Sequence, residues 1–428
     1  MLSSGMVGEK GMTSSASGVF DSYNDSMLSS EKGVAVVGSS NVDLTYRVPR
    51  FPKLGETLSA LSYEQHFGGK GANQAFCISK LSSKEPRVVF VSVVGNDSYG
   101  IEMKQYYREN HFFNVDKNIH TAQPLHGQGT TSTTTTTTTT DSSTSTNTSG
   151  GSGSNNSSTT TSNNIPTGQA LIFVENESGN NSIVLIGGSN DLFSIEMVEK
   201  SWDDISQCRV VVCQNETPLP TTYYTLKRAK QEGIITIFNV APALNMLNLP
   251  ESFSDLPKYV DYLICNESEA PIVIGKNDMS TDFVQQDSLI EGMCREIQEK
   301  LNIPNVIITL GEKGCAALYS YQSDSNTSTT TDQERNVEMM TTTTSTTTTT
   351  SNDTLQFIHV KGKKVDHVVD TTGAGDAWVG SFAYFISCDI PIPDSMELSN
   401  FIASITVQHA GAQLSYNSLS QATILDKL

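Results

Sequence analysis

Short runs of β-branched and other apolar residues alternate along the chain with longer amphipathic stretches. The runs have the length of buried strands and occupy residues 33–38, 87–94, 209–213, 234–238, 259–265 and 306–310. The amphipathic stretches have the length of helices and occupy residues 71–81, 195–202, 220–232 and 288–301. This alternation predicts an α/β fold, a doubly wound and mostly parallel sheet with helices on both faces.

Two segments depart from this alternation. Residues 44–67 and 167–188 show alternating or extended patterns, and no amphipathic helix follows either of them. We therefore expect a small separate β-sheet, which is a candidate lid over a site on the main domain.

Ser, Thr and Asn are concentrated in three parts of the chain, at 1–32, 128–164 and 322–353. These parts contain too few apolar residues to offset the entropy of ordering, so we predict a disordered tail and two disordered insertions. Long insertions between neighbouring elements destabilise a fold only slightly. The remainder predicts one domain over 33–428, and a regulatory or partner-binding role for the insertions stays open.

The charge balance excludes two classes of partner. The chain has 27 basic and 46 acidic residues, a net charge of −19, which disfavours binding to nucleic acid or an anionic membrane. No apolar run is long enough to span a bilayer, and no targeting signal is evident at the start. The seven cysteines form no C-x-x-C pair, which is typical of reduced buried thiols. We expect a cytoplasmic protein, with the nucleus as a second possible location.

The strongest local motif is DTTGAGD at 370–376, followed by a helix-like stretch. Glycines before a helix expose backbone N–H groups, and together with the helix dipole these form an anion site. An aspartate beside that anion suits a base that deprotonates an attacking hydroxyl. The structural alternative is a glycine turn with Asp376 as an ordinary N-cap.

A second glycine-rich motif, FGGKGANQ, occupies residues 67–74. It is not a Walker A loop, because Lys70 is followed by Gly71 and the required earlier glycine is missing. Its glycines allow a ligand to approach the backbone closely, and Lys70 and Asn73 supply hydrogen bonds. A flexible turn is the alternative interpretation.

Polar or glycine-containing clusters follow several of the predicted strands, where ligands bind in open α/β sheets. They are Asn41 with Asp43, Gln214 with Glu216, Asn266 with Glu269, and Thr309 with Gly311. A single aspartate after a strand is more often a cap or turn residue. The convergence of several clusters therefore indicates a site better than any one of them.

Together these motifs resemble the ribokinase-like (PfkB) family of sugar kinases. The main matches are 38–74, 266–269 and 369–376, and the lesser ones are 167–173, 239–243, 308–311 and 411–415. The resemblance covers the chain from residue 33 to its end, apart from the two Thr/Ser-rich tracts. GGKGANQ followed about 300 residues later by DTTGAGD is a specific combination.

The resemblance implies a role for each matching residue. Asp376 would be the catalytic base toward the 5-hydroxyl of the sugar, and the backbone N–H groups of Gly373, Ala374 and Gly375 would stabilise the charge on the γ-phosphate. Residues implied to bind the sugar, in addition to Asp376, are Asn41, Asp43, Gly69, Lys70, Asn73 and Glu216. Residues implied to bind ATP are Asn266, Thr309, Gly311, Gly373 and Gly375.

Two cations are implied as well. Glu269 would position Mg²⁺ through water, and a loop would bind an activating K⁺, mostly through backbone carbonyls. The residues implied in the K⁺ loop are Asp370, Thr372, Thr406, His409, Gly411 and Ser415. Leu414 stands in that loop where the family pattern has proline.

The activity implied is ATP-dependent phosphorylation of D-ribose to D-ribose 5-phosphate, by a homodimer that associates through the β lid. One alternative is a kinase for another acceptor: 2-deoxyribose, a nucleoside or another sugar. The other is a non-catalytic sugar-binding scaffold, against which the presence of Asp376, Asn266 and Glu269 argues.

Overall fold

The computed structural model describes residues 33–82, 88–123, 164–177, 181–276, 282–321, 345–350 and 353–419. The predicted tail and most of the two predicted insertions lie outside these residues, so their predicted disorder stays a prediction. Within these residues, none of the helices is long and apolar enough to cross a bilayer.

The main sheet has ten strands among the described residues, in the order β13-β14-β12-β11-β10-β9-β8-β1-β4-β5. The strands are β1 (Val34–Val37), β4 (Val88–Val94), β5 (Ile119–Thr121), β8 (Val210–Gln214), β9 (Ile235–Asn239), β10 (Tyr262–Asn266), β11 (Asn305–Thr309), β12 (Cys315–Tyr321), β13 (Ser345–Thr350) and β14 (Asp353–Val360). Pairing is parallel from β5 to β11, and β12, β14 and β13 add an antiparallel edge. The predicted α/β fold is confirmed, and the sequence pattern missed β5 and the antiparallel edge.

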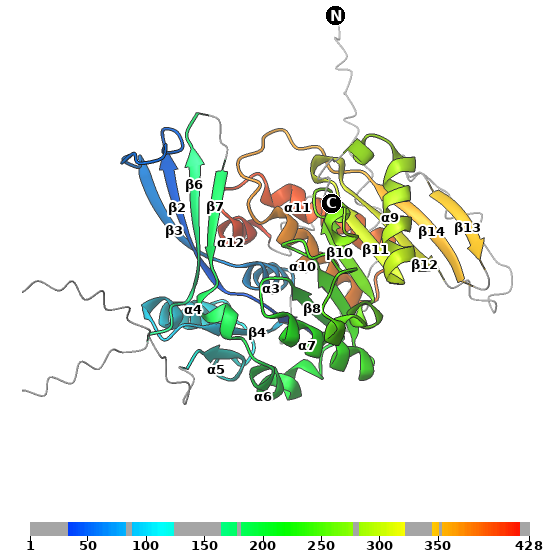
Figure 1. Ribbon diagram of the computed structural model, residues 1–428, viewed down its shortest axis with the longest axis horizontal. Helices are drawn as coiled ribbons and strands as arrows, with labels where there is room; N and C mark the ends of the chain where they lie inside the picture. The colour runs from blue at the N-terminus through cyan, green and yellow to red at the C-terminus, as the bar shows by residue number, and fades with distance from the viewer. Residues whose placement is uncertain are drawn as a thin grey trace, which may run out of the picture.

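Helices cover both faces of this sheet (Figure 1). Val34 and Val36 of β1 pack in the core that contains α3 (Lys70–Leu81), α4 (Ser98–Glu109), α10 (Ala374–Ser387) and α11 (Ile392–Thr406). Ala35 and Val37 pack in the opposite core, with α6 (Ile195–Ile205), α7 (Leu219–Gln231) and α9 (Asp287–Leu301). Three further helices are short: α5 (Val115–Asn118), α8 (Ala270–Val273) and α12 (Ala412–Ser415). Both faces of the central strands are therefore buried, which explains their continuous apolar runs.

A second sheet of four strands stands apart from the main one, at the upper left of Figure 1. Its strands are β2 (Asn41–Val48), β3 (Ser62–Gly68), β6 (Gly168–Glu175) and β7 (Asn181–Ile186), in the order β3-β2-β6-β7. Strands β2 and β6 pair in parallel, and the outer pairs are antiparallel. The small sheet expected from the two irregular segments is confirmed.

Strand β13 lies within the Thr-rich tract 322–353, for which the sequence composition predicts disorder. It pairs with β14 along the edge of the main sheet, from Ser345 opposite Ile358 to Thr350 opposite Asp353. Threonine is β-branched and favours extended backbone, which a neighbouring edge strand can recruit. The structure therefore differs from the prediction over these six residues.

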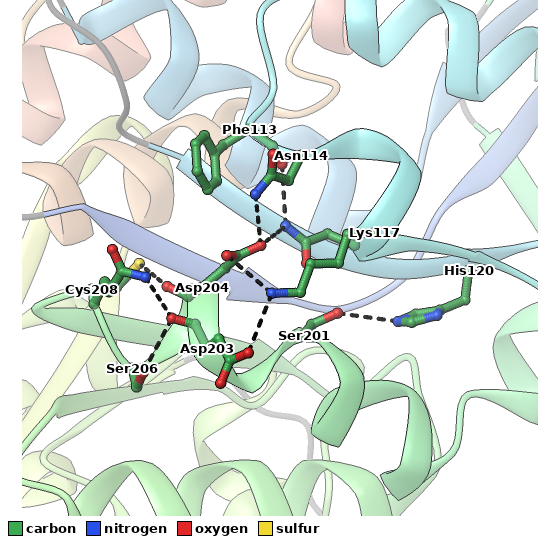
Figure 2. A network of polar contacts seen from close by, with 11 residues as sticks. Phe113, Asn114, Lys117, His120, Ser201, Asp203, Asp204, Ser206 and Cys208 are labelled. Atoms are coloured by element: carbon green, nitrogen blue, oxygen red, sulfur yellow. Dashed lines mark hydrogen bonds and ion pairs between the residues drawn. The ribbon is translucent and has the colours of Figure 1, made fainter.

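A polar network around the buried Asp204 joins α5 to α6 on the side of the sheet that carries α6 (Figure 2). The carboxylate of Asp204 accepts hydrogen bonds from Asn114 Nδ2 at 3.1 Å and Asn118 Nδ2 at 3.0 Å. Lys117 Nζ lies 3.2 Å from the other carboxylate oxygen. This carboxylate has both hydrogen-bond donors and a counter-charge, which together explain how an acidic side chain is stable when buried.

Candidate active site

The carboxyl ends of the parallel strands meet the two glycine-rich motifs at one edge of the main sheet. A pocket of about 140 Å³ lies there. Among its lining residues are Lys70, Asn239, Asn266, Glu269, Thr309, Gly373, Gly375 and Asp376. The fold thus brings together groups that are up to about 300 residues apart in the sequence. The carboxyl edge of the strands, where they meet, is the usual place for a ligand in an open α/β sheet.

The N-terminus of α10 is shaped by two glycines with different environments. Gly373 is the N-cap, with a φ of 76°, and a Cβ there would lie 2.6 Å from the Cβ of Ala412. A Cβ at Gly375 would meet no atom within 4 Å, because this position faces open space on the pocket. Gly373 is therefore required by the backbone, whereas Gly375 leaves room for a ligand beside the first N–H groups of the helix.

Asp376 is the third residue of α10 and not its N-cap. Its two carboxylate oxygens accept hydrogen bonds from α3: Asn73 Nδ2 donates to Oδ2 at 2.9 Å, and Gln74 Nε2 donates to Oδ1 at 3.2 Å. The side chain is thus directed across to α3 and into the pocket rather than onto the backbone of its own helix. The interpretation of Asp376 as an ordinary cap is wrong.

Asn41, the first residue of the lid strand β2, has its side chain held in one orientation by Asn190. Asn190, in a 3₁₀ turn (Gly188–Leu192), donates from Nδ2 to Asn41 Oδ1 at 2.7 Å and to the carbonyl of Ser40 at 3.1 Å. The backbone N–H of Ser40 donates in return to Asn190 Oδ1 at 3.0 Å. Because its oxygen is already engaged, Asn41 offers its Nδ2 group as a donor to a ligand.

The charges of the site are one lysine, Lys70, and four carboxylates: Asp43, Glu216, Glu269 and Asp376. Burial, then the neighbouring Glu216 and Asp376, raise the pKa of Asp43 to about 7. Burial alone would lower the pKa of Lys70, but the surrounding carboxylates, Asp376 and Glu216 foremost, hold it above its ordinary value. Lys70 therefore stays a cation among acidic groups, which suits it to an anionic ligand such as a phosphate.

Glu216 lies beside the first turn of α3. Its Oε2 accepts from Ser39 Oγ at 2.6 Å and from the backbone N–H of Lys70 at 3.0 Å. The preceding Gly69 has a φ of 92°, and a Cβ there would lie 2.8 Å from the backbone nitrogen of Asn41. Glu216 also lines a pocket of about 510 Å³ with Asn41 and Asn190, beneath the lid strand β7. Of the predicted sugar-binding residues, Asn41 and Glu216 thus line this pocket, whereas Lys70 and Asp376 line the smaller one.

A larger pocket of about 500 Å³ continues from the first, because both are lined by Asn266, Thr309 and Gly375. Its wall also includes Gly311 and several apolar residues, Val365, Val368, Trp378, Ala403 and Val407. A polar end that reaches the helix N-terminus and an apolar remainder are what a nucleotide requires, with phosphates at one end and a base at the other.

Asn266 and Glu269 form a closed turn after β10. Asn266 Oδ1 accepts from the backbone N–H of Ser268 and of Glu269, each at 2.9 Å, and the backbone N–H of Asn266 donates to Glu269 Oε2 at 2.9 Å. Burial raises the pKa of Glu269. No group of three or more His, Cys, Asp or Glu side chains that could hold a metal ion occurs in the described part of the chain. A divalent cation at Glu269 would therefore need further ligands from a phosphate or water.

The residues predicted to bind potassium lie in two adjoining segments. Asp370 joins them: its carboxylate accepts from the backbone N–H of Thr372 at 2.9 Å and of Gly411 at 2.8 Å. Burial would raise the pKa of Asp370, but these hydrogen bonds hold it below its ordinary value. The hydroxyls of Thr406 and Ser415 donate to carbonyls of their own helices, at 2.9 and 2.7 Å.

His409 and Leu414 complete the description of this loop. His409 is exposed, and its backbone N–H donates to the carbonyl of Thr406 at 3.0 Å. Leu414, the departure from the family pattern, is half-exposed. Since the hydroxyls are engaged locally, any cation here would depend on backbone carbonyls and on Asp370.

Sequence reasoning missed four amide side chains at the site: Gln74, Asn190, Asn239 and Gln413. Gln74, Asn239 and Gln413 stand inside stretches that the sequence singles out, so their position was visible although their role was not. Asn190 lies in a stretch without any motif, and no signal in the sequence marks it. Its contact with Asn41 spans 149 residues and exists only in the fold.

Comparison with known proteins agrees with this geometry. The model of the pfkB family carbohydrate kinases matches residues 31–160, 151–338 and 343–419. A ribokinase of Dictyostelium discoideum is 30% identical over 397 residues, 90% of this chain and 98% of the relative. A deoxyribokinase of Salmonella typhi is 29% identical over 389 residues, 91% of this chain and 96% of the relative. The crystal structure of a ribokinase from Thermotoga maritima superposes with a TM-score of 0.61 at 26% identity, covering 92% of this chain and 99% of that one.

Proposed function

The chain belongs to the pfkB family of carbohydrate kinases, enzymes that phosphorylate a sugar hydroxyl, and on this premise we propose that its acceptor is D-ribose, phosphorylated by ATP at the 5-hydroxyl. The observation that carries the proposal is the position of Asp376. It lines the pocket between Lys70 and the N-terminus of α10, and both of its oxygens face donors from α3. A hydroxyl placed there meets a base on one side and an anion site on the other.

In the proposed mechanism Asp376 accepts the proton of the attacking hydroxyl as the bond to the γ-phosphorus forms. The negative charge on the transferred group is met by the backbone N–H groups of Gly373, Ala374 and Gly375 and by the ammonium of Lys70. Transfer is direct, with no covalent enzyme intermediate, because a base and an anion site suffice when donor and acceptor are held in line.

Mg²⁺ would be held with the nucleotide by Glu269, through water, beside Asn266. When bound, it would neutralise charge on the phosphates. The raised pKa of Glu269 supports this placement, because a buried carboxylate that gains a cation is relieved of its desolvation.

K⁺ would bind the carbonyls around Asp370, Thr372, Thr406, His409, Gly411 and Ser415, and so order the loop that precedes Gly373. Its support is the pair of hydrogen bonds by which Asp370 joins the two segments. Potassium should raise turnover relative to sodium at equal ionic strength, with little effect on the KM for ribose. Equal rates in the two salts would reject this site.

The acceptor assignment rests on the polar groups at the start of β2. Asn41 offers a donor, and Asp43 can accept from two adjacent hydroxyls once it is ionised. A substrate that lacks one hydroxyl would leave a buried group unpaired, at about 1–3 kcal/mol. We expect ribose to be preferred to 2-deoxyribose by roughly tenfold or more, and adenosine to be poor because this part of the site is polar and rich in glycine.

The deciding measurement is kcat/KM for ribose, 2-deoxyribose and adenosine side by side, from ADP release, with Asp376→Asn as the blank. The Asp43→Ala variant should narrow the gap between ribose and 2-deoxyribose. A preference for 2-deoxyribose, as the name of the Salmonella relative suggests for that enzyme, would replace the acceptor and keep the kinase. A highest kcat/KM for adenosine would indicate a nucleoside kinase. The absence of turnover with all three acceptors would indicate a non-catalytic scaffold.

We also propose a homodimer through the lid sheet. Its edge strand β7 exposes consecutive apolar residues, Ile183, Val184, Leu185 and Ile186, each at least 43% accessible in the single chain. Sedimentation of Ile183→Lys and Val184→Lys tests this, because successive strand residues point to opposite faces. At least one variant should be monomeric, and two unchanged dimers would contradict the lid contact.

A cytoplasmic location completes the proposal. All seven cysteines are buried, which fits the reduced thiols of a protein from a reducing compartment.

A further inference from the structure

We infer that a chain of buried side-chain amides positions Asp376, and that Gln74, Gln214 and Gln413 are positioning residues for the reaction. The inference rests on the proposed function, because it takes Asp376 to be the base. The three glutamines come from α3, β8 and α12, so the chain links elements on several sides of the pocket.

The direction of the amides on one side is determined by a backbone carbonyl. The carbonyl of Ile264 can only accept, so Asn239 must present Nδ2 to it, at 3.2 Å. Asn239 Oδ1 is then the acceptor for Gln74 Nε2, at 3.0 Å. The same Nε2 group donates to Asp376 Oδ1, and Gln214 Nε2 donates to Gln74 Oε1 at 2.7 Å. Each amide therefore has one allowed orientation.

The other side of Asp376 is ordered in the same way. Gln413 Nε2 donates to Asn73 Oδ1 at 3.0 Å, and Asn73 Nδ2 donates to Asp376 Oδ2. Each carboxylate oxygen thus accepts one amide N–H, from two consecutive residues of α3. Rotation of the carboxylate would break at least one of these bonds, so the plane of the carboxylate is held relative to the pocket.

The two ends of the chain of amides lower the stability of the fold. Gln214 and Gln413 are almost fully buried, and within the described residues their Oε1 atoms have no hydrogen-bond partner. A buried acceptor without a partner destabilises a fold. An apolar side chain at either position would avoid that loss, and the glutamines are instead directed toward the donors that Asp376 needs.

Gly38 holds the outer end of the chain in place. A Cβ at residue 38 would lie 1.9 Å from Gln214 Oε1 and 3.0 Å from the Cα of Gly71. No side chain fits there while Gln214 keeps its bond to Gln74. The backbone after β1 and the amide of Gln214 are thus matched in shape.

The test replaces single amides with methionine, which keeps the length of the side chain and removes its hydrogen bonds. With the acceptor that the wild-type enzyme uses best, Gln74→Met and Gln413→Met should each lower kcat by about 10- to 100-fold. The KM values for acceptor and ATP should change by less than about threefold, because the binding groups remain. The conservative Gln74→Glu variant should fail as well, because an acceptor would then face Asp376 Oδ1.

Asn118→Leu is the matched control, because it removes a buried amide that donates to Asp204, far from the pocket of Asp376 in the sequence and on another helix. It should lower the melting temperature and leave the kcat of the folded enzyme unchanged. If the glutamine variants behave like this control, with a lower melting temperature and normal kcat, the amides are structural and the inference is overturned.

A double-mutant cycle separates this inference from the proposed function. In the Asp376→Asn background, Gln74→Met should change the residual rate by less than about twofold, because the amide acts through the carboxylate. A full additive loss would overturn the positioning role while leaving the base intact. Near-native turnover of Asp376→Asn itself would overturn both the base assignment and the inference built on it.

Discussion

Two aspartates, the partly buried Asp376 and the buried Asp204, receive nearly the same hydrogen bonds and differ in what else surrounds them. Each accepts from two side-chain amides, Asp376 from α3 and Asp204 from Asn114 and Asn118. Asp204 also forms an ion pair with Lys117, and its side chain is only 7% exposed (Figure 2). Asp376 lines a pocket, and among the described residues no lysine or arginine lies within ion-pair distance of it.

The comparison shows how the same polar contacts serve stability in one place and chemistry in another. The carboxylate of Asp204 has its counter-charge in Lys117, 3.2 Å away, so its contacts are satisfied within the fold. A carboxylate held only by neutral amides is oriented without being neutralised, and it keeps lone pairs for a ligand. Lys70, which lines the same pocket as Asp376, is also subject to the charges of Glu216, Glu269 and Asp43.

The largest expected effect is that of Asp376→Asn, set against Asp204→Asn. The first should lower kcat by roughly 10²–10⁴, the usual range for a lost general base, and leave ribose and ATP binding intact. The second should lower the free energy of unfolding by about 1–3 kcal/mol and leave kcat unchanged. Steady-state kinetics and thermal melts of both variants check this, and a kcat loss in Asp204→Asn would abolish the distinction between the two regions.

The next largest difference is expected between substitutions of the two glycines at the N-terminus of α10, Gly375 and Gly373. The new side chain in Gly375→Val would point into open space, so the stability of the protein should remain nearly unchanged. The variant should lower kcat by about 10²–10³, because the side chain would keep the phosphate from the backbone N–H groups. Gly373→Ala should lower stability instead, since its backbone has a positive φ and its Cβ would collide with Ala412. Normal kcat in folded Gly375→Val would remove the anion site from this helix.

A third effect concerns the charge of Asp43 and depends on pH. Asp43 has an ordinary pKa of 3.8, which burial and then Glu216 and Asp376 raise to about 7 in the folded protein. Between pH 4 and 7 the folded state binds the extra proton, so the free energy of unfolding falls as the pH rises through this range. The destabilisation is complete above about pH 7.

Asp43→Asn should therefore raise the free energy of unfolding by roughly 1–4 kcal/mol at pH 8 and change it little at pH 4. Urea unfolding of both proteins across this range measures the difference. Asp204→Asn serves as the contrast, because it should be destabilising at pH 8. A stabilisation of Asp43→Asn that is independent of pH would show that charge is not its cause.

Periodicity alone was sufficient for most of the parallel core, because strands buried on both faces must be continuously apolar. The runs at 87–94 and 306–310, for example, became β4 and β11 with ends shifted by one residue. Strands β12 and β14 were missed because antiparallel neighbours are not joined by a crossover helix, so the alternation of strand and helix along the sequence does not mark them. Strand β13 was missed because its threonines are indistinguishable in composition from the tract around them.

The sequence by itself determined which backbone positions had to be glycine and which carboxylate stood at the head of α10, because motifs such as GGKGANQ and DTTGAGD are local constraints on chain conformation. Only the tertiary structure decided how those groups face one another. Asn73 and Gln74 of α3 reach Asp376 of α10, and Gln413 of α12 reaches Asn73. Asn190 reaches Asn41 at the start of the lid. A hydrogen bond needs its two atoms within about 3 Å, and for residues far apart in the chain that distance is set by packing and not by sequence spacing.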